Sequence, residues 1–132
     1  MTGETSLQHL LSSLAPAIMP GEFVFCSLQN AALADYAQLS PLATFLESEG
    51  LTLVLPRGSA DRAGIAYESV FRCITLTIHS SLDAVGLTAA VAGRLAERGI
   101  SANVIAAYYH DHVFVPSEQA STALTALEEL ND

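Results

Sequence analysis

A serine-rich loop is the first stretch of this chain whose residue types suggest chemistry. Residues 80–86 read Ser-Ser-Leu-Asp-Ala-Val-Gly and connect a β-branched run at 71–79 to a helical pattern at 84–98. The first turn of a helix offers unpaired N–H groups and the positive end of the helix dipole, which stabilise a carboxylate or phosphate. Gly86 would allow close approach of a ligand or a neighbouring backbone. An ordinary helix start capped by serine or aspartate explains the same residues, so both interpretations stay open.

A histidine–aspartate–histidine sequence at residues 110–112 is the second such stretch. Imidazole and carboxylate groups ligate zinc, but three consecutive residues at a tight turn do not converge on one metal. The spacing therefore favours a turn, in which Asp111 holds the backbone or pairs with a ligand ammonium. A serine, a histidine and an aspartate are also the ingredients of a hydrolase, but the Gly-x-Ser-x-Gly elbow that exposes a nucleophile is absent. We predict no catalytic residue and no metal site, and keep a metal-dependent hydrolase using His110, Asp111 and His112 as the less favoured alternative.

The second half of the chain predicts the elements that position these residues. Strands at 71–79, 103–109 and 112–115 alternate with a helix at 84–98, which Gly99 ends, and with a C-terminal helix after Ser117. This β-α-β-β-α order favours a split βαβ fold, with an antiparallel or mixed sheet and helices on one face. We expect strand 51–55 to supply the missing edge. One ring of Tyr108-Tyr109 is expected in the core and the other at a surface or pocket.

The first half shows weaker patterns. Leucines at 7, 10, 11 and 14 predict a short helix, and alternating runs predict strands at 22–28 and 51–55. Pro41 after a serine predicts a helix at 42–49 that Gly50 ends, and residues 57–64 look turn-like. A weak repeat relates residues 46–52 to 95–101, each interpreted as a helix end, a glycine and a strand start. Two related halves would explain it.

Composition limits the class of protein. The chain has 132 residues, half of them hydrophobic, which is enough for a core. Its net charge of −9 argues against nucleic acid and anionic membranes as partners. Cys26 and Cys73 lie in apolar runs and are expected to be buried, reduced thiols. No signal peptide or membrane span is evident, so we expect a cytoplasmic protein.

Several of these segments resemble bacterial ACT-domain proteins of the tandem type, whose modules are similar to those of the eukaryotic arginine sensors of the TOR pathway. The resemblance rests on Phe71–Leu76, Ser80–Ala89 and Tyr108–Pro116, and also covers Pro20–Cys26 and Glu49–Leu55. It implies an α+β, ferredoxin-like sandwich of two ACT-like halves, at 1–66 and 67–132. ACT modules typically bind amino acids at the loop between a strand and a helix, near an interface between modules.

The resemblance also implies which residues bind a ligand. The loop supplies all but one of them, and Asp111 matches an acidic position that faces a ligand's cationic group. The expected set is Ser80, Ser81, Leu82, Ala84, Val85, Gly86, Leu87 and Asp111.

We therefore predict a non-catalytic regulatory protein that binds an amino acid, needs no cofactor and forms a homodimer. A structural interaction subunit without a ligand is the alternative from a different class.

Overall fold

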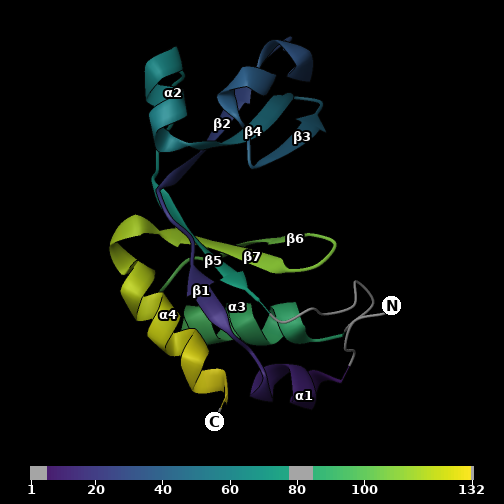
Figure 1. Cartoon of the computed structure of the whole chain (residues 1–132), viewed down its shortest axis with the longest axis vertical. Helices are drawn as coiled ribbons and strands as arrows, with labels where there is room; N and C mark the ends of the chain where they lie inside the picture. The colour runs from purple at the N-terminus through teal and green to yellow at the C-terminus, as the bar shows by residue number, and fades with distance from the viewer. Residues whose placement is uncertain (1–5, 78–84, 132) are drawn as a thin grey trace. The chain divides into compact units, whose positions relative to one another are not determined.

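The structure, a computed structural model, describes residues 6–77 and 85–131 (Figure 1). The chain divides into two compact units. Unit 1 comprises residues 1–20 and 72–132, and unit 2 comprises residues 21–71. Packing thus joins the N-terminal segment to the C-terminal one. The predicted boundary between residues 66 and 67 divides the chain into two consecutive modules, which is a different division from the two compact units. This boundary stays a prediction.

Unit 1 contains a sheet in the order β1-β5-β7-β6, with helices on one face. Its pairs β1–β5 and β6–β7 are antiparallel. Its elements are α1 (Leu7–Ser12), β1 (Pro16–Ile18), β5 (Phe71–Leu76), α3 (Leu87–Glu97), β6 (Asn103–Ala106), β7 (Asp111–Pro116), α4 (Ala120–Glu128) and the 3-10 turns η3 (Ser117–Gln119) and η4 (Glu129–Asn131).

The core of unit 1 lies between this sheet and its helices. Alternate residues of β5 and β7, including Ile74 and Val113, face α3 and α4 and are fully buried. Leu10 of α1 belongs to the same core, as the leucine spacing predicts, and the Ser6 hydroxyl caps α1 by accepting from the His9 N–H (3.4 Å). At the far end of α3 and α4, Arg94 and Arg98 pair with Glu129.

One prediction for unit 1 is wrong. The edge strand beside β5 is β1, not residues 51–55, because Pro16–Ile18 pairs with Ile74–Leu76. The buried face of α3 consists of Leu87, Val91 and Leu95, whereas Ala89 and Gly93 are exposed and Ala90 and Ala92 are half-buried. Leucine and valine bury more apolar area than alanine, so the helix orients the face that carries them toward the core.

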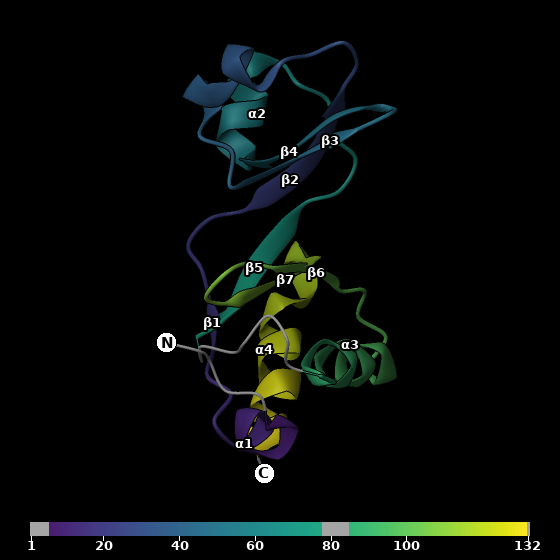
Figure 2. The same cartoon turned by 90° about the vertical axis from the view of Figure 1, so that its right-hand side faces the viewer.

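Unit 2 is a second antiparallel arrangement with its own core. Its elements are β2 (Phe23–Leu28), the 3-10 turns η1 (Leu33–Asp35) and η2 (Ala37–Leu39), β3 (Ala43–Glu47), β4 (Gly50–Pro56) and α2 (Arg57–Ala63). β4 lies between β3 and β2, and Phe71 at the start of β5 pairs with Phe23. The turns and α2 cover one face of the β2–β4 pair, whose buried residues include Val24, Cys26 and Leu53 (Figure 2).

The helix predicted at 42–49 is wrong, because residues 43–47 form strand β3. Threonine and phenylalanine favour strands, and Ser48-Glu49 is a two-residue turn that returns the chain into β4. Gly50 does not end a helix. A Cβ atom at Gly50 would lie 2.9 Å from the Leu28 carbonyl oxygen, so the close approach of β2 requires glycine.

Residues 57–63 form a helix where a turn was expected. Gly58 and three charged residues obscure the periodicity, but Ser59 and Ala60 are buried, and Gly64 ends the helix with a φ of 69°.

The helix α2 shows where the two halves really repeat. β4 ends at Pro56 (φ −54°, ψ 135°) and β7 ends at Pro116 (φ −52°, ψ 136°), and each proline leads directly into a helical segment. The predicted repeat of 46–52 with 95–101 is therefore wrong, since the first of these stretches is a hairpin.

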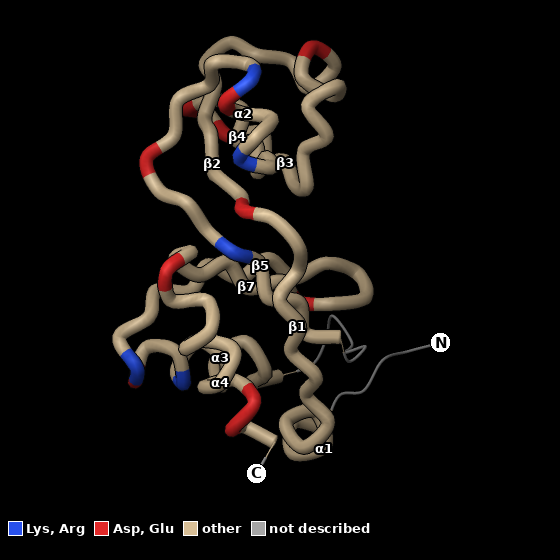
Figure 3. The backbone as a smooth tube through the Cα atoms, turned by 60° about the vertical axis from the view of Figure 1, so that its left-hand side comes forward, with Lys and Arg blue, Asp and Glu red and all other residues tan. Residues whose placement is uncertain are grey.

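Both cysteines are free and buried, as predicted, and burial raises the pKa of each thiol. The chain has no lysine, and its five Lys and Arg positions are all arginines (Figure 3). Two lie on α2, two at the end of α3 and one at the start of β5. Among residues 6–77 and 85–131, no helix has the length and apolar character needed to cross a bilayer.

Candidate functional site

The predicted ligand loop connects β5 to α3 in unit 1. Ser80, Ser81, Leu82 and Ala84 lie outside the described residues. Val85, Gly86 and Leu87 are described, and they form the entry to α3.

These three residues differ in exposure. Val85 is 81% exposed, whereas Leu87 is buried in the core of unit 1, so its side chain packs rather than faces solvent. Gly86 is the N-cap of α3 and has a φ of 94°, which strongly favours glycine. A Cβ atom at Gly86 would lie 3.0 Å from Leu7 of α1. Replacing Gly86 by valine is therefore expected to lower the stability of the fold, and it would not test binding alone.

Asp111 is the described residue of the predicted set with the strongest chemical signal. The sequence predicted Asp111 in the turn, and that prediction is wrong, because Asp111 is the first residue of β7. Its exposure is only 8%. No described residue donates a hydrogen bond to its carboxylate or forms an ion pair with it. Burial raises the pKa of this carboxyl group, although the neighbouring histidines oppose the shift. A buried carboxylate without a charged partner is costly, which makes a cationic ligand favourable there.

The fold brings Asp111 to the same end of the sheet as the loop. β5 and β7 are neighbours, and the Thr75 hydroxyl lies 2.9 Å from Nδ1 of His112, the residue after Asp111. β5 ends at Leu76, where the chain continues toward the loop and α3. Asp111 alternates with Val113, so it projects to the face that carries α3.

His112 projects to the opposite face from Asp111, because consecutive residues of a strand alternate. Its hydrogen bond to Thr75 and its half-burial assign it to the structure of the sheet. His110 lies in the hairpin, beside the ring of Tyr109. These three residues therefore do not converge on one point, and the geometry gives no support to a hydrolase or metal centre built from them.

The stability of the protein is expected to depend on the protonation of His112. Burial lowers its pKa, so the folded state favours the neutral imidazole. This contribution to stability is present above the ordinary histidine pKa of about 6.5 and is lost as the pH falls below it. We predict that His112→Gln reduces the loss of unfolding free energy between pH 7 and 5, measured by urea denaturation. His9→Gln, at an exposed position of α1, is the control, and an unchanged pH profile in His112→Gln would contradict the prediction.

The tyrosine pair differs from expectation. Tyr108 and Tyr109 form the tip of the β6–β7 hairpin, closed by the Ala107 N–H donating to the His110 carbonyl (3.0 Å). Both rings are exposed (67% and 60%) and lie edge to face at 5.0 Å. Neither ring enters the core, because the strand ends before them.

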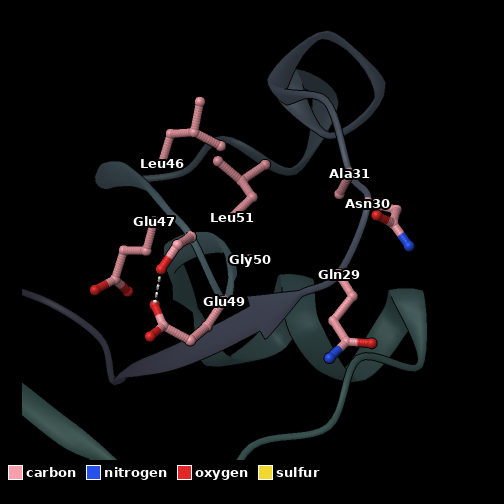
Figure 4. A pocket seen from close by; sticks show the side chains of 9 residues that line it. Gln29, Asn30, Ala31, Leu46, Glu47, Glu49, Gly50 and Leu51 are labelled. Carbon is pink, nitrogen blue, oxygen red and sulfur yellow. Dashed lines mark hydrogen bonds between the residues drawn. The ribbon is translucent and has the colours of Figure 1, made fainter.

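Unit 2 contains a hollow of about 440 Å³ that sequence reasoning missed (Figure 4). It lies between the residues that follow β2 and the β3–β4 hairpin. β2 leads to the β3–β4 hairpin as β5 leads to the β6–β7 hairpin, so this hollow lies after β2 as the predicted ligand loop lies after β5. It is lined by Gln29, Asn30, Ala31, Leu46, Glu47, Ser48, Glu49, Gly50 and Leu51.

The lining of this hollow is polar and acidic. The Glu47 carboxylate accepts from the Thr52 hydroxyl (2.6 Å), and the Glu49 carboxylate accepts from the Ser48 hydroxyl (3.0 Å). No lysine or arginine lines it. The residue type at position 30 was the available signal in the sequence, since asparagine tolerates the left-handed conformation in tight turns. Asn30 adopts that conformation, with a φ of 53°.

Family models agree with this architecture. One model of the ACT domain matches residues 2–72, and a second matches residues 68–129. No curated protein matches the chain.

Solved structures extend the comparison. A protein of unknown function from Vibrio cholerae, described as a possible transport protein, is 55% identical, with 97% of this chain and 98% of that chain covered and a TM-score of 0.88. A protein from Agrobacterium tumefaciens is 16% identical, with 89% of each chain covered and a TM-score of 0.75. The ligand-free regulatory subunit of aspartate kinase from Thermus thermophilus is 10% identical, with 91% and 99% covered and a TM-score of 0.63, which shows a shared fold.

Proposed function

Because this chain belongs to the ACT-domain family, with two ACT domains in tandem, we propose that it is a non-catalytic regulatory protein that binds a free amino acid. The binding site is the β5–α3 loop together with Asp111. Its residues are Ser80, Ser81, Leu82, Ala84, Val85, Gly86, Leu87 and Asp111.

The observation that supports this site is the buried carboxylate of Asp111. It is 8% exposed, has no described hydrogen-bond donor, and lies at the end of the sheet from which the loop leaves. Proteins rarely keep such a carboxylate unless a partner completes its environment. An amino-acid ammonium or a cationic side chain is a partner of the right charge.

A free amino acid matches both ends of this site. Helix α3 is 11 residues long, and its first turn presents N–H groups and positive dipole at Gly86–Ala89. The ligand carboxylate is placed there and the cationic group at Asp111. Leu87 contributes its backbone N–H, since its side chain is buried in the core.

The acidic hollow of unit 2 is the second place at which the same class of ligand fits. It follows the first strand of its unit, and its two carboxylates suit an ammonium group. Glu49→Gln tests this hollow separately from Asp111.

Two further properties belong to the proposal. We expect a homodimer in the cytoplasm, as the resemblance implies for association between ACT modules. A ligand-free interaction subunit remains the second function, supported by the exposed apolar side chains of Phe45 and Leu46 on β3.

A thermal-shift screen of the twenty amino acids tests the function. Ligand at 100 times its Kd stabilises the folded state by about 2.7 kcal/mol, which raises the Tm by several degrees. We expect one amino acid, or one chemical class, to raise the Tm of the wild type by more than that of Asp111→Asn at the same ligand concentration. No shift with any of the twenty would favour the ligand-free interaction subunit.

A further inference from the structure

Helix α1 lies against the entry to α3. A Cβ atom at Gly86, the N-cap residue of α3, would lie 3.0 Å from Cδ2 of Leu7. Outside the neighbouring residues of the chain, the three atoms nearest to that position are all carbons of the Leu7 side chain. Leu7 is half-buried and packs against the core of unit 1. The first residue of α1 therefore covers the backbone at which α3 begins.

The segment that follows α1 contacts the other end of the connection between β5 and α3. Ala15 lies between α1 and β1, and its carbonyl oxygen accepts from both the Thr77 N–H (3.0 Å) and the Thr77 hydroxyl (2.7 Å). Thr77 is the residue that follows β5. The N-terminal segment thus contacts both described ends of this connection, through Leu7 at Gly86 and through Ala15 at Thr77.

Other residues hold α1 in this position. Leu10 is fully buried and Leu14 is 2% exposed, and both belong to the core of unit 1. β1 begins at Pro16, which pairs with Leu76 of β5. Because these anchors do not involve Leu7, its side chain can be changed without removing what holds the helix in place.

The contact from Leu7 supplies an apolar surface and no hydrogen-bond acceptor. Among the described residues no side chain caps α3, and its first helical hydrogen bond runs from the Ala90 N–H to the Gly86 carbonyl (2.9 Å). The N–H groups of residues 87–89 therefore have no acceptor within the helix. The buried carboxylate of Asp111, which has no described donor, is the independent sign that a ligand binds on this face of the sheet.

We propose that Leu7 is a further residue of the amino-acid site in unit 1, where it covers the ligand carboxylate at the first turn of α3. This inference rests on the function proposed above and gives α1 a part in ligand affinity. An apolar side chain at this position excludes water from the N–H groups of the first turn. A negative charge interacts more strongly with a helix N-terminus when the geometry is partly buried. Leu7 therefore acts at the carboxylate of the ligand, whereas Asp111 acts at its cationic group.

Truncation of Leu7 tests this role. Leu7→Ala is expected to raise the Kd of the amino acid found in the screen about fivefold, measured by calorimetry, because water reaches the first turn of α3. Leu7→Met keeps the apolar volume and is expected to stay within about twofold of wild type. Leu11→Ala is the matched control, since Leu11 is half-buried against the same core one helical turn further along α1. It is expected to lower the free energy of unfolding in urea as much as Leu7→Ala does, and to leave the Kd unchanged.

A measurement on the wild type complements the variants. The amino acid is expected to slow hydrogen exchange at residues 87–89 and in α1 together. Protection of residues 87–89 without α1, or a wild-type Kd in Leu7→Ala, would overturn the role of Leu7 and leave the proposed function standing. Equal weakening of binding by Leu7→Ala and Leu11→Ala would reflect lost stability and would overturn that role as well. A screen in which no amino acid binds the wild type would overturn the proposed function and this inference together.

Discussion

Replacing Asp111 by asparagine is expected to weaken amino-acid binding roughly 10- to 150-fold. A charge-assisted contact between a carboxylate and an ammonium contributes about 1.5–3 kcal/mol, and about 1.4 kcal/mol corresponds to a factor of ten in Kd. Asparagine keeps the size of the side chain, removes its charge and replaces one acceptor oxygen by an NH2 donor. Titration calorimetry with the amino acid found in the screen measures the change.

The same substitution is expected to raise the free energy of unfolding of the ligand-free protein at pH 7. Burial raises the pKa of Asp111 in the folded state, so its relative contribution to stability is present below the ordinary pKa of about 3.9 and is lost as the pH rises through the folded value. Asparagine does not titrate. The stability gained by Asp111→Asn should therefore grow from acidic to neutral pH and then stay constant.

Opposite effects on binding and stability would distinguish a binding residue from a structural one. Asp35→Asn, at an exposed position of η1, is the control and should change neither quantity. Unchanged affinity in a folded Asp111→Asn protein would remove Asp111 from the site. Reduced stability at pH 7 would mean that the carboxylate has a stabilising partner in the fold.

The sequence was most informative where one face of a strand is buried. β2 and β4 alternate or run continuously apolar, and the pairs Cys26–Leu53 and Val24–Leu55 bury those residues in one core. Burial fixes such a pattern, because a slip of one residue would expose the whole apolar set. The antiparallel or mixed sheet was predicted from the β-α-β-β-α order of elements, and the resemblance added its ferredoxin-like character.

The errors fall where burial does not fix the pattern. β3 is exposed on both faces, so its residues show no alternation, and the proline before it suggested a helix. β1 has only three residues, and pairing with β5 determines its conformation. α2 buries only Ser59 and Ala60, which give no apolar stripe. In each case the conformation of the segment is determined by packing or pairing with residues distant in sequence, and local propensity alone does not predict it.

The candidate site shows the same limit. The resemblance identified Asp111 as a site residue. The burial of Asp111 depends on the strand order and on its position as the first residue of β7, whereas the sequence predicted Asp111 in a turn. The hollow around Glu49 could not be predicted from the sequence, because residues 29–31 approach the β3–β4 hairpin only once β2 has paired with β4. Chemical groups could be recognised from sequence, but their convergence is a property of the fold.

Replacing Leu53 by alanine is expected to lower the free energy of unfolding by about 2–5 kcal/mol, the largest stability effect predicted for this chain. Leu53 is fully buried in β4, opposite Cys26 of β2 and Thr44 of β3. The substitution removes apolar contacts and leaves a cavity that the paired strands on both sides cannot readily close. Such a loss is a large fraction of the 5–15 kcal/mol typical of a domain.

Urea denaturation at low protein concentration measures this loss, and Leu42→Ala is the matched control because Leu42 is 52% exposed. The control is expected to stay within about 0.5 kcal/mol of wild type. The two cores share no residue, so hydrogen exchange in Leu53→Ala should accelerate first in β2 and β4. Leu95→Ala, in the core of unit 1, should instead accelerate exchange first in α3. If either substitution accelerated exchange equally in all strands, the two cores would unfold as one cooperative body, and the division into two units would have no energetic counterpart.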